Sequence, residues 1–385
     1  MDKTKLRTFA DKLRAFLPHV ITFLKENTVL CVAILAAAVT SFIIPPDAEY
    51  LNYFDFKTLS CLFCVLAVVS ALRNIRFFYT LAKATVRKFK NAKVAILVLV
   101  YVTFIGSMLI ANDMALLTFL PLGYFILHTT GKEKYMAFTF IMQNIAANLG
   151  GMLTPFGNPQ NLYLYSKFNI PDGEFVSIML PPFCVAILLI TVCCLIFVKN
   201  EPLEIQERAA ELPIPRVIVY LLLFAVSILM VFRFMPYQAG LIIIPIALLF
   251  LDREALLRVD YGLLFTFVFF FIFAGNMGRI DAVRDFFSSL LGINTLIFSA
   301  LSCQIISNVP SAILLSQFTD NYRELLLGVN IGGAGTLIAS LASLITFKEY
   351  SRHDPKHTLA YILKFTVFNF VFLLILILFC YIFKI

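Results

Sequence analysis

The chain has 385 residues, of which 61 % are hydrophobic and only 14 % are charged. This balance excludes an ordinary soluble globular domain, in which about a quarter of the residues are charged. The net charge of +8 does not indicate nucleic-acid binding, because the basic residues gather beside apolar segments, where they set orientation in a membrane. The composition therefore predicts an all-α polytopic membrane protein embedded in a lipid bilayer.

The first segment, residues 1–26, has apolar residues at helical spacing with Lys and Arg between them, which predicts an amphipathic helix lying on the membrane surface. The apolar run that follows is not expected to be a signal peptide, because twenty-seven residues precede it and no small-residue cleavage site comes after it. Several apolar runs approach the length that crosses ~30 Å of hydrocarbon as a helix. The runs are 28–44, 58–72, 94–110, 175–198, 217–232, 240–251, 261–274 and 359–383.

One motif occurs twice along the chain. Residues 148–162 read NLGGMLTPFGNPQNL, and residues 330–344 read NIGGAGTLIASLASL. A gapless alignment preserves the order of small and polar residues, as expected of an internal repeat. Further landmarks precede both copies in the same order. The aligned pairs are Asp55 and Asp260, Arg73 and Arg279, Asn112 and Asn308, Thr154 and Thr336, Asn158 and Ser340, and Asn161 and Ser343.

The number of crossings sets the relative orientation of the two copies. Each copy has four predicted crossings, and residues 94–127 are predicted to form a re-entrant hairpin with Asn112 and Asp113 near its tip. One unpaired span separates the copies, so the repeats should be inverted. A cytoplasmic N-terminus places 23 of the 31 Lys and Arg residues inside, in agreement with the positive-inside rule. The predicted organisation is an amphipathic helix at 1–26, a first repeat at 27–198, a linker with the unpaired span at 199–237, and a second repeat at 238–385.

The repeated motif should break a helix within the membrane. Pro155 and Pro159 each remove a backbone donor, and such a break persists only where it faces protein or a water-filled cavity. Inverted repeats with broken helices are typical of secondary transporters, whose binding site lies near the midplane. The candidate substrate-binding residues are Asn112, Gly157, Asn158, Asn161, Ser307, Asn308, Ser340 and Ser343, and the candidate coupling-ion residues are Asp113, Thr154 and Thr336.

Two features of this candidate site have alternative interpretations. Asp113 is the carboxylate placed deep in the membrane, where it could bind Na⁺ or exchange a proton, or could cap the second arm of the hairpin. The glycine pairs Gly150-Gly151 and Gly332-Gly333 could serve the site or allow close helix packing. The eight cysteines lie mostly inside apolar runs and are expected to be small buried residues, so no metal site is predicted.

The motif residues resemble those of the ion transporter superfamily, specifically citrate-transporter-like permeases, which include divalent anion–sodium symporters and arsenite permeases. Gly151-x-x-Thr154-x-x-Gly157-x-Pro159-x-Asn161-Leu162 is similar to the first-repeat signature of the dicarboxylate symporters. Ala111-Asn112-Asp113 looks more like the hairpin of arsenite permeases, and Val309 departs from the Ser-Asn-Thr motif of the symporters. The resemblance implies two hairpins meeting near the midplane, an elevator-like movement and a homodimer.

The function expected from the sequence is secondary active transport of a small anion, either a dicarboxylate or an inorganic oxyanion, coupled to Na⁺ or H⁺ without any other cofactor. The alternative is an arsenite- or antimonite-type efflux permease or a sodium/proton antiporter. A channel is disfavoured by the asymmetric, amide-rich repeat tips. An enzyme is not expected, since H-E-x-x-H, G-x-S-x-G and P-loop motifs do not occur. The expected location is a bacterial inner membrane.

Overall fold

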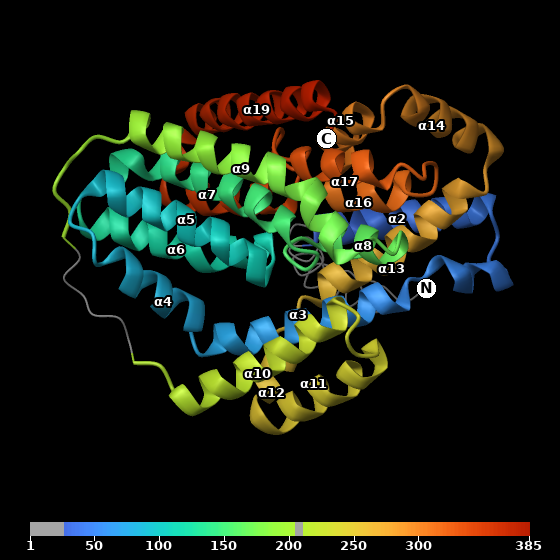
Figure 1. Cartoon of the computed structure of the whole chain (residues 1–385), viewed down its shortest axis with the longest axis horizontal. Coiled ribbons are helices and arrows are strands. Elements are labelled where there is room, and N and C mark those ends of the chain that lie inside the picture. Colours follow the sequence, from blue (N-terminus) through green and yellow to red (C-terminus); the bar gives the residue numbers. More distant parts are fainter. Residues whose placement is uncertain (1–26, 205–210) are drawn as a thin grey trace, which may run out of the picture. The chain divides into compact units, whose positions relative to one another are not determined.

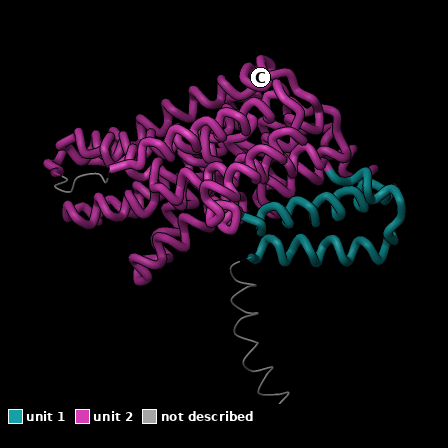
Figure 2. Tube along the Cα trace, turned by 90° about the horizontal axis from the view of Figure 1, so that it is seen from below, with its two compact units in different colours: residues 1–54, 260–280 teal, residues 55–259, 281–385 magenta. Residues whose placement is uncertain are grey.

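The computed structural model describes residues 27–204 and 211–385, so the predicted amphipathic helix at 1–26 lies outside the described residues. The described part is almost entirely helical, with one isolated antiparallel bridge between Asn91 and Pro202. The chain forms two compact units (Figure 2). Unit 1 combines the segment up to residue 54 with residues 260–280, and unit 2 contains residues 55–259 and 281–385.

Unit 1 is built from α2 (Thr28–Ile43), the short 3₁₀ helix η1 (Ala48–Tyr53) and α13 (Tyr261–Gly278). Helix α13 packs along α2 and is capped by Asp260, whose Oδ1 accepts the Leu263 N–H at 2.9 Å. At the other end of α13, Arg279 forms an ion pair with Asp47 at 2.7 Å. The predicted landmarks Asp260 and Arg279 thus lie at the two ends of one helix.

Unit 2 contains the other helices, several of which are labelled in Figure 1. They are α3 (Phe56–Asn74), α4 (Phe77–Val86), α5 (Ala92–Ile110), α6 (Asn112–Thr129), η2 (Glu133–Tyr135), α7 (Met136–Gly150), η3 (Gly151–Leu153), α8 (Pro159–Lys167), α9 (Asp172–Phe197), α10 (Ile214–Val231), α11 (Tyr237–Leu251), α12 (Arg253–Leu257), α14 (Asp281–Ile293), α15 (Thr295–Ile306), α16 (Asn308–Leu315), α17 (Tyr322–Ile331), α18 (Leu341–His353), η4 (Pro355–His357) and α19 (Thr358–Phe383).

Among the described residues, six helical segments are long and apolar enough to cross a membrane. They include α3, α5, α9, α10, α13 and the segment that ends with α19, while α2, α11 and α15 are shorter apolar helices. Each of the eight predicted apolar runs coincides with one helix, and the ends of run and helix differ by at most four residues. The prediction of a helical membrane protein is therefore confirmed.

The same order of helices occurs twice within unit 2. A helix pair (α5–α6 or α15–α16) is followed by an interrupted helix (α7–α8 or α17–α18) and then by a long apolar helix (α9 or α19). Figure 1 shows α5, α6 and α7 running side by side. The second parts of the interrupted helices pack across the halves: α8 contacts α16 and α17, and α18 contacts α6 and α7. This exchange brings the two helix breaks to the same region.

Candidate functional site

Both helix pairs turn at a residue with an unusual backbone conformation. Ala111, between α5 and α6, has φ 64° and ψ 149°, and Ser307, between α15 and α16, has φ 75° and ψ 160°. Neither residue is a glycine, so each turn stores about 1–3 kcal/mol of backbone strain. The next residue closes each turn in the same way: Asn112 Oδ1 accepts the Asp113 N–H, and Asn308 Oδ1 accepts the Val309 N–H, both at 2.9 Å.

The chain interrupts its helices at both copies of the repeated motif. In the first copy α7 ends at Gly150, the short helix η3 follows, and α8 begins at Pro159. A proline is tolerated at the first position of a helix, because the N–H that it lacks would have no intrahelical acceptor there. In the second copy the break runs from the end of α17 to Ser340, whose Oγ accepts the Ser343 N–H at the start of α18. Each break therefore exposes helix ends to the other half of unit 2.

Buried amide side chains connect the two breaks. Asn158 Nδ2 donates to the backbone oxygen of Asn148 at 3.2 Å and to Asn330 Oδ1 at 3.1 Å. Asn330 Nδ2 donates in turn to Asn161 Oδ1 at 2.6 Å. Gln160 Nε2 also approaches Asn330 Oδ1, at 3.4 Å. The aligned residues Asn148 and Asn330, one from each repeat, are thus joined through a single side chain.

The tips of both helix pairs reach the same place. Asn112 Nδ2 donates to Asn148 Oδ1 at 3.1 Å. On the other side, a methyl group added at Gly333 would lie 3.3 Å from Asn308 Nδ2 and 3.7 Å from Asn148 Oδ1. We call this group of side chains the amide cluster. Its members are Asn112, Asn148, Asn158, Gln160, Asn161, Asn308 and Asn330.

The amide cluster contains polar atoms that no other described group satisfies. Asn148 Nδ2, Asn158 Oδ1 and Gln160 Oε1 are buried without a hydrogen-bond partner among the described residues. Leaving such a group unpaired costs about 1–3 kcal/mol, so an unpaired polar atom in a native interior calls for an explanation. One donor and two acceptors are therefore available to a small polar ligand.

The two predicted threonines have matching roles in the structure. Thr154 Oγ1 donates to the backbone oxygen of Met108 on α5, at 2.7 Å. Thr336 Oγ1 donates to the backbone oxygen of Gln304 on α15, at 3.1 Å. Each hydroxyl therefore fastens a helix break to the first arm of the preceding helix pair, while its oxygen can still accept a hydrogen bond.

The glycine pairs divide between packing and the site. A methyl group at Gly150 would collide with the backbone oxygen of Phe104 on α5, and one at its repeat partner Gly332 would lie 2.9 Å from the Cα of Ala300 on α15. The second glycines face the site: a methyl at Gly151 would collide with Asn158 Oδ1, and Gly333 lies beside Asn308. Close packing explains the first glycine of each pair, and access of polar side chains explains the second.

Asp113 lies in the first turn of α6 with 9 % of its surface exposed. The positive end of the helix dipole stabilises a carboxylate at this position. The side chain that accepts the Asp113 N–H is that of Asn112. The alternative role predicted for Asp113 was to cap this helix. At the Asp113 N–H, the capping oxygen comes from the preceding residue, Asn112.

The structure brings together most of the predicted binding residues and adds others. The hydroxyls of Ser340 and Ser343 contact each other at 3.5 Å, and Ser340 Oγ caps α18 by accepting the Ser343 N–H. Gly157 lies against the backbone of Gly151, and Ser307 Oγ donates to the oxygen of Ala339 at 3.4 Å. Three members of the amide cluster were not among the residues predicted from the sequence, although they lie in the repeated motifs: Asn148, Gln160 and Asn330. Their signal was available, since uncharged amides within an apolar helical segment mark a polar interior.

Comparison with known proteins identifies relatives along most of the chain. The citrate transporter family matches residues 20–321. An uncharacterized transporter of Methanocaldococcus jannaschii is 33 % identical over 301 residues, which cover 78 % of this chain and 82 % of that protein. The inner membrane protein YbiR of Escherichia coli is 26 % identical, with 76 % of this chain and 80 % of its own length covered. An uncharacterized transporter of Mycobacterium tuberculosis is 24 % identical, with coverages of 76 % and 77 %.

The family match spans more than half of the chain, and the archaeal relative covers more than two thirds of it at over 30 % identity. Both agree with the resemblance seen in the repeated motifs and with the helical membrane architecture. They also agree with the expectation of a transporter rather than an enzyme. The chain belongs to the citrate transporter family.

Proposed function

We propose that this protein is a secondary active transporter that carries a small anion across the membrane, coupled to Na⁺ or H⁺. The observation that carries the proposal is the amide cluster, in which Asn158 bridges Asn148 and Asn330 of the two repeats. A buried polar site shared by two helix breaks is the arrangement by which transporters bind a substrate near the bilayer midplane. The description of the family makes citrate the first anion to test.

Four helix N-termini support the choice of an anion. Helix α6 begins at Asn112, α16 at Asn308, α8 at Pro159 and α18 at Leu341, all at or beside the amide cluster. The first N–H groups of a helix have no intrahelical acceptor, and the helix dipole places about half a positive charge there. These ends can stabilise carboxylate or phosphate oxygens without a buried cationic side chain.

Backbone oxygens of the first break support coupling to a cation. The carbonyl oxygens of Gly151, Met152 and Thr154 all lie within 3.2–3.3 Å of Asn161 Nδ2. Unwound carbonyls at the end of a half-helix are the groups that coordinate Na⁺ in transporters of this kind. Asp113 could balance such a cation or take up a proton. We therefore assign the coupling step to the first repeat.

Asp113 also favours a second candidate function. A buried carboxylate at the end of a membrane helix suits cation exchange, as in an arsenite-type efflux permease or a sodium/proton antiporter. The second repeat has Val309 at the equivalent position, so cation exchange would depend on one side of the cluster.

The membrane arrangement is part of the same proposal. We infer that the two repeats are inverted, with the helix pairs α5–α6 and α15–α16 entering from opposite faces and the N-terminus in the cytoplasm of a bacterial cell. The exchange of contacts between α8 and α16 and between α18 and α6 supports a two-fold relation. A homodimer would agree with the resemblance. Accessibility labelling of single cysteines placed at the two tips tests the inversion.

Transport by the full-length protein in proteoliposomes tests the proposal directly. Radiolabelled citrate, succinate and phosphate are supplied outside, under an imposed inward gradient of Na⁺ or of protons. We expect gradient-driven accumulation of at least one anion. In Asp113→Asn the gradient should no longer accelerate uptake. The matched control is Asp281→Asn, which removes an exposed acid from the first turn of α14.

The opposite result is equally clear. Absence of gradient-driven uptake of any of the three anions, together with sodium/proton exchange that Asp113→Asn abolishes, would replace the anion transporter by the antiporter. A change of the same size in Asp281→Asn would mean that the loss of charge acts on the protein in general.

A further inference from the structure

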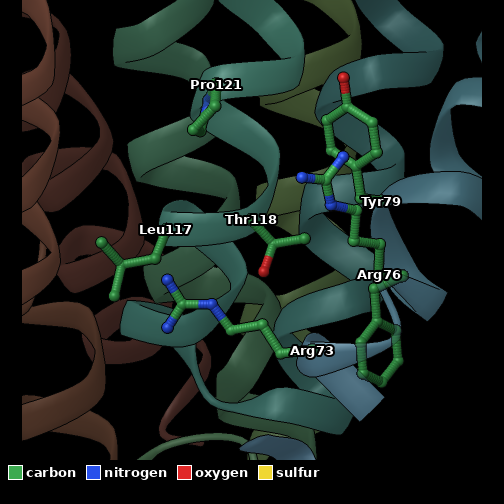
Figure 3. A pocket seen from close by; sticks show the side chains of 7 residues that line it. Arg73, Arg76, Tyr79, Leu117, Thr118 and Pro121 are labelled. Atoms are coloured by element: carbon green, nitrogen blue, oxygen red, sulfur yellow. The ribbon is translucent and has the colours of Figure 1, made fainter. Parts of the chain in front are cut away.

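Unit 2 contains a basic cavity outside the amide cluster. The cavity has a volume of about 370 Å³ and lies between the α3–α4 corner and α6. Figure 3 shows Arg73, Arg76 and Tyr79 on one side and Leu117, Thr118 and Pro121 of α6 on the other. A second cavity of about 550 Å³ shares Arg73 and Arg76 with the first. The two arginines therefore line both cavities.

Neither arginine forms an ion pair within the described part of the chain. Arg258, which lines the second cavity, pairs with Glu254 at 2.5 Å and donates to Asn74 Oδ1. Asn74 Nδ2 binds the carboxylate of Asp252 at 3.1 Å. Glu254 is thus paired with Arg258, Asp252 is bound by the Asn74 amide, and among the described residues no carboxylate forms an ion pair with Arg73 or Arg76.

Arg73 and its repeat partner Arg279 have different surroundings. Arg279 binds the carboxylates of Asp47 at 2.7 Å and Glu49 at 3.5 Å. Arg73 instead donates to the sulfur of Met114, at 3.7 Å, a weak acceptor. The arginine of the second repeat has an ion pair, while that of the first forms none with residues 27–204 or 211–385, so its guanidinium can bind an external anion.

The backbone holds the second arginine in place at a cost. Arg76 has φ 54° and ψ 30°, the left-handed conformation that glycine or asparagine usually adopts. Helix α4 is fixed against α6 next to this corner, because the Lys83 ammonium lies 4.5 Å from the centre of the Phe125 ring. Because an arginine occupies this strained position, we infer that the side chain of Arg76 has a function in addition to forming the turn.

We propose that this cavity binds a small multivalent oxyanion, a di- or tricarboxylate or inorganic phosphate, through Arg73 and Arg76. Guanidinium groups form paired hydrogen bonds to carboxylate and phosphate oxygens, and two of them match an anion of at least two charges. The site is separate from the amide cluster, but Arg73 reaches the residue next to Asp113. It gives a transported anion a first binding place beside the tip of α5–α6. The choice of anions rests on the proposed function, whereas binding to the cavity does not require transport.

The amino-acid composition provides a direct readout of this cavity. The chain contains no tryptophan, so Tyr79→Trp introduces the sole tryptophan, at the cavity wall. The full-length variant is placed in phosphatidylcholine nanodiscs and titrated with citrate, succinate or phosphate against KCl at matched ionic strength. We expect a saturable change in fluorescence with at least one of the anions. Leu117→Trp, on the opposite wall, serves as a second reporter if the first variant does not fold.

The arginine variants decide whether the signal belongs to the proposed site. In the Tyr79→Trp reporter protein, the additional substitutions Arg73→Gln and Arg76→Gln should raise the apparent Kd for the anion at least tenfold. The matched control, Arg87→Gln with Lys88→Gln, removes the same charge from exposed residues that follow α4 and should change the Kd by less than about twofold. An equal loss in both double variants would reduce the effect to general electrostatics and overturn the proposal.

Two further comparisons are needed. One distinguishes a soluble anion from a lipid headgroup, and the other distinguishes failure of this site from failure of the proposed transport function. If phosphatidylglycerol in the nanodisc produces the arginine-dependent signal and the soluble anions do not, the cavity is a lipid headgroup site and the proposal is wrong. Arginine-dependent binding in a protein that does not accumulate any of the anions would reject the proposed function and leave this site intact. Accumulation without a saturable signal from either reporter would reject this site alone.

Discussion

Asn158 and Asn330, which are 172 residues apart in the sequence, share a hydrogen bond of 3.1 Å between the side-chain nitrogen of the first and the side-chain oxygen of the second. Both side chains are almost fully buried. In such surroundings a hydrogen bond is electrostatically strong, and an unpaired amide is costly. The contact therefore fixes the relative position of the two helix breaks.

Asn330→Ala should impair both stability and transport. The change leaves three amides of the first break without their shared partner, at about 1–3 kcal/mol for each buried group that stays unpaired. We expect a lower melting temperature in detergent and at least a tenfold loss of anion uptake in proteoliposomes.

Asn369→Ala is the control for Asn330→Ala. Asn369 is a buried amide of α19, outside both helix breaks in the sequence, and its Oδ1 accepts a hydrogen bond from Asn144 Nδ2 at 3.4 Å. The Asn369→Ala substitution should lower the melting temperature, but the folded variant should retain most of the anion uptake. Equal losses of uptake in the two variants would argue against a special role of the amide cluster.

Gly150→Ala should destabilise the protein, because the added methyl meets the backbone oxygen of Phe104 and cannot be accommodated by a side-chain movement. Overpacking of this kind costs about 1–3 kcal/mol. Gly173→Ala is the matched control, since nothing lies within 4 Å of the added methyl on α9. There alanine should be neutral or stabilising by up to ~1 kcal/mol, through its higher helix propensity. Similar melting curves for the two variants would contradict the close approach of α5 and α7.

Thr154→Val and Thr336→Val should have similar effects on stability. Each change removes one hydroxyl that binds a backbone oxygen of the first hairpin arm, worth about 0.5–1.5 kcal/mol. Thr85→Val is the control, because the Thr85 hydroxyl donates to the backbone oxygen of Leu81 in its own helix and to no other helix that the structure describes. Thermal unfolding measures all three. A large loss in one threonine variant and none in the other would mean that the two repeats are not fastened in the same way.

Glu201 should make stability depend on pH in acid. Hydrogen bonds from Lys132, Lys134 and Tyr135 lower the pKa of its carboxyl to about 2, from an ordinary value of 4.5. A group with a lowered folded-state pKa stabilises the protein above its unfolded pKa, and this stabilisation is lost as the pH falls from about 4.5 toward 2. We expect the melting temperature to fall over this interval more steeply than in Glu201→Gln.

The control for the pH experiment is Glu254→Gln, which removes one partner of the exposed pair with Arg258. Exposed pairs on one helix contribute little to stability, so this variant should follow the wild-type pH profile. If Glu201→Gln shows the same dependence of melting temperature on pH as the wild type, other groups cause the acid sensitivity.

Sequence patterns were sufficient for the eight apolar helices and for the position of the breaks, but not for helices such as α4 and α14. Apolar runs identify membrane helices directly, and the prolines and glycines of the repeated motif mark the interruption between α7 and α8. Sequence patterns could not identify the turns at Ala111 and Ser307, because neither residue favours a positive φ. Such a conformation is imposed by tertiary packing.

The composition of the site was predicted only in part for a similar reason. Alignment of the repeats paired Asn158 with Ser340, whereas in the structure Asn158 binds Asn330, which aligns with Asn148. An alignment pairs residues that have the same position in each repeat. Contacts between the two repeats instead join residues at different positions, as Asn158 and Asn330 do. Selecting all buried amides near the motifs would have included Asn148 and Asn330.

The attachment of each helix break to the hairpin arm before it has a mechanical consequence. Gly150 and Thr154 hold the first break against α5, and Gly332 and Thr336 hold the second against α15. If a helix pair moved by itself, these hydrogen bonds would break and buried backbone oxygens would lose their donors. A conformational change that moves a helix pair must therefore move the helix break with it as a rigid unit, with the backbone adjusting in the connecting segments.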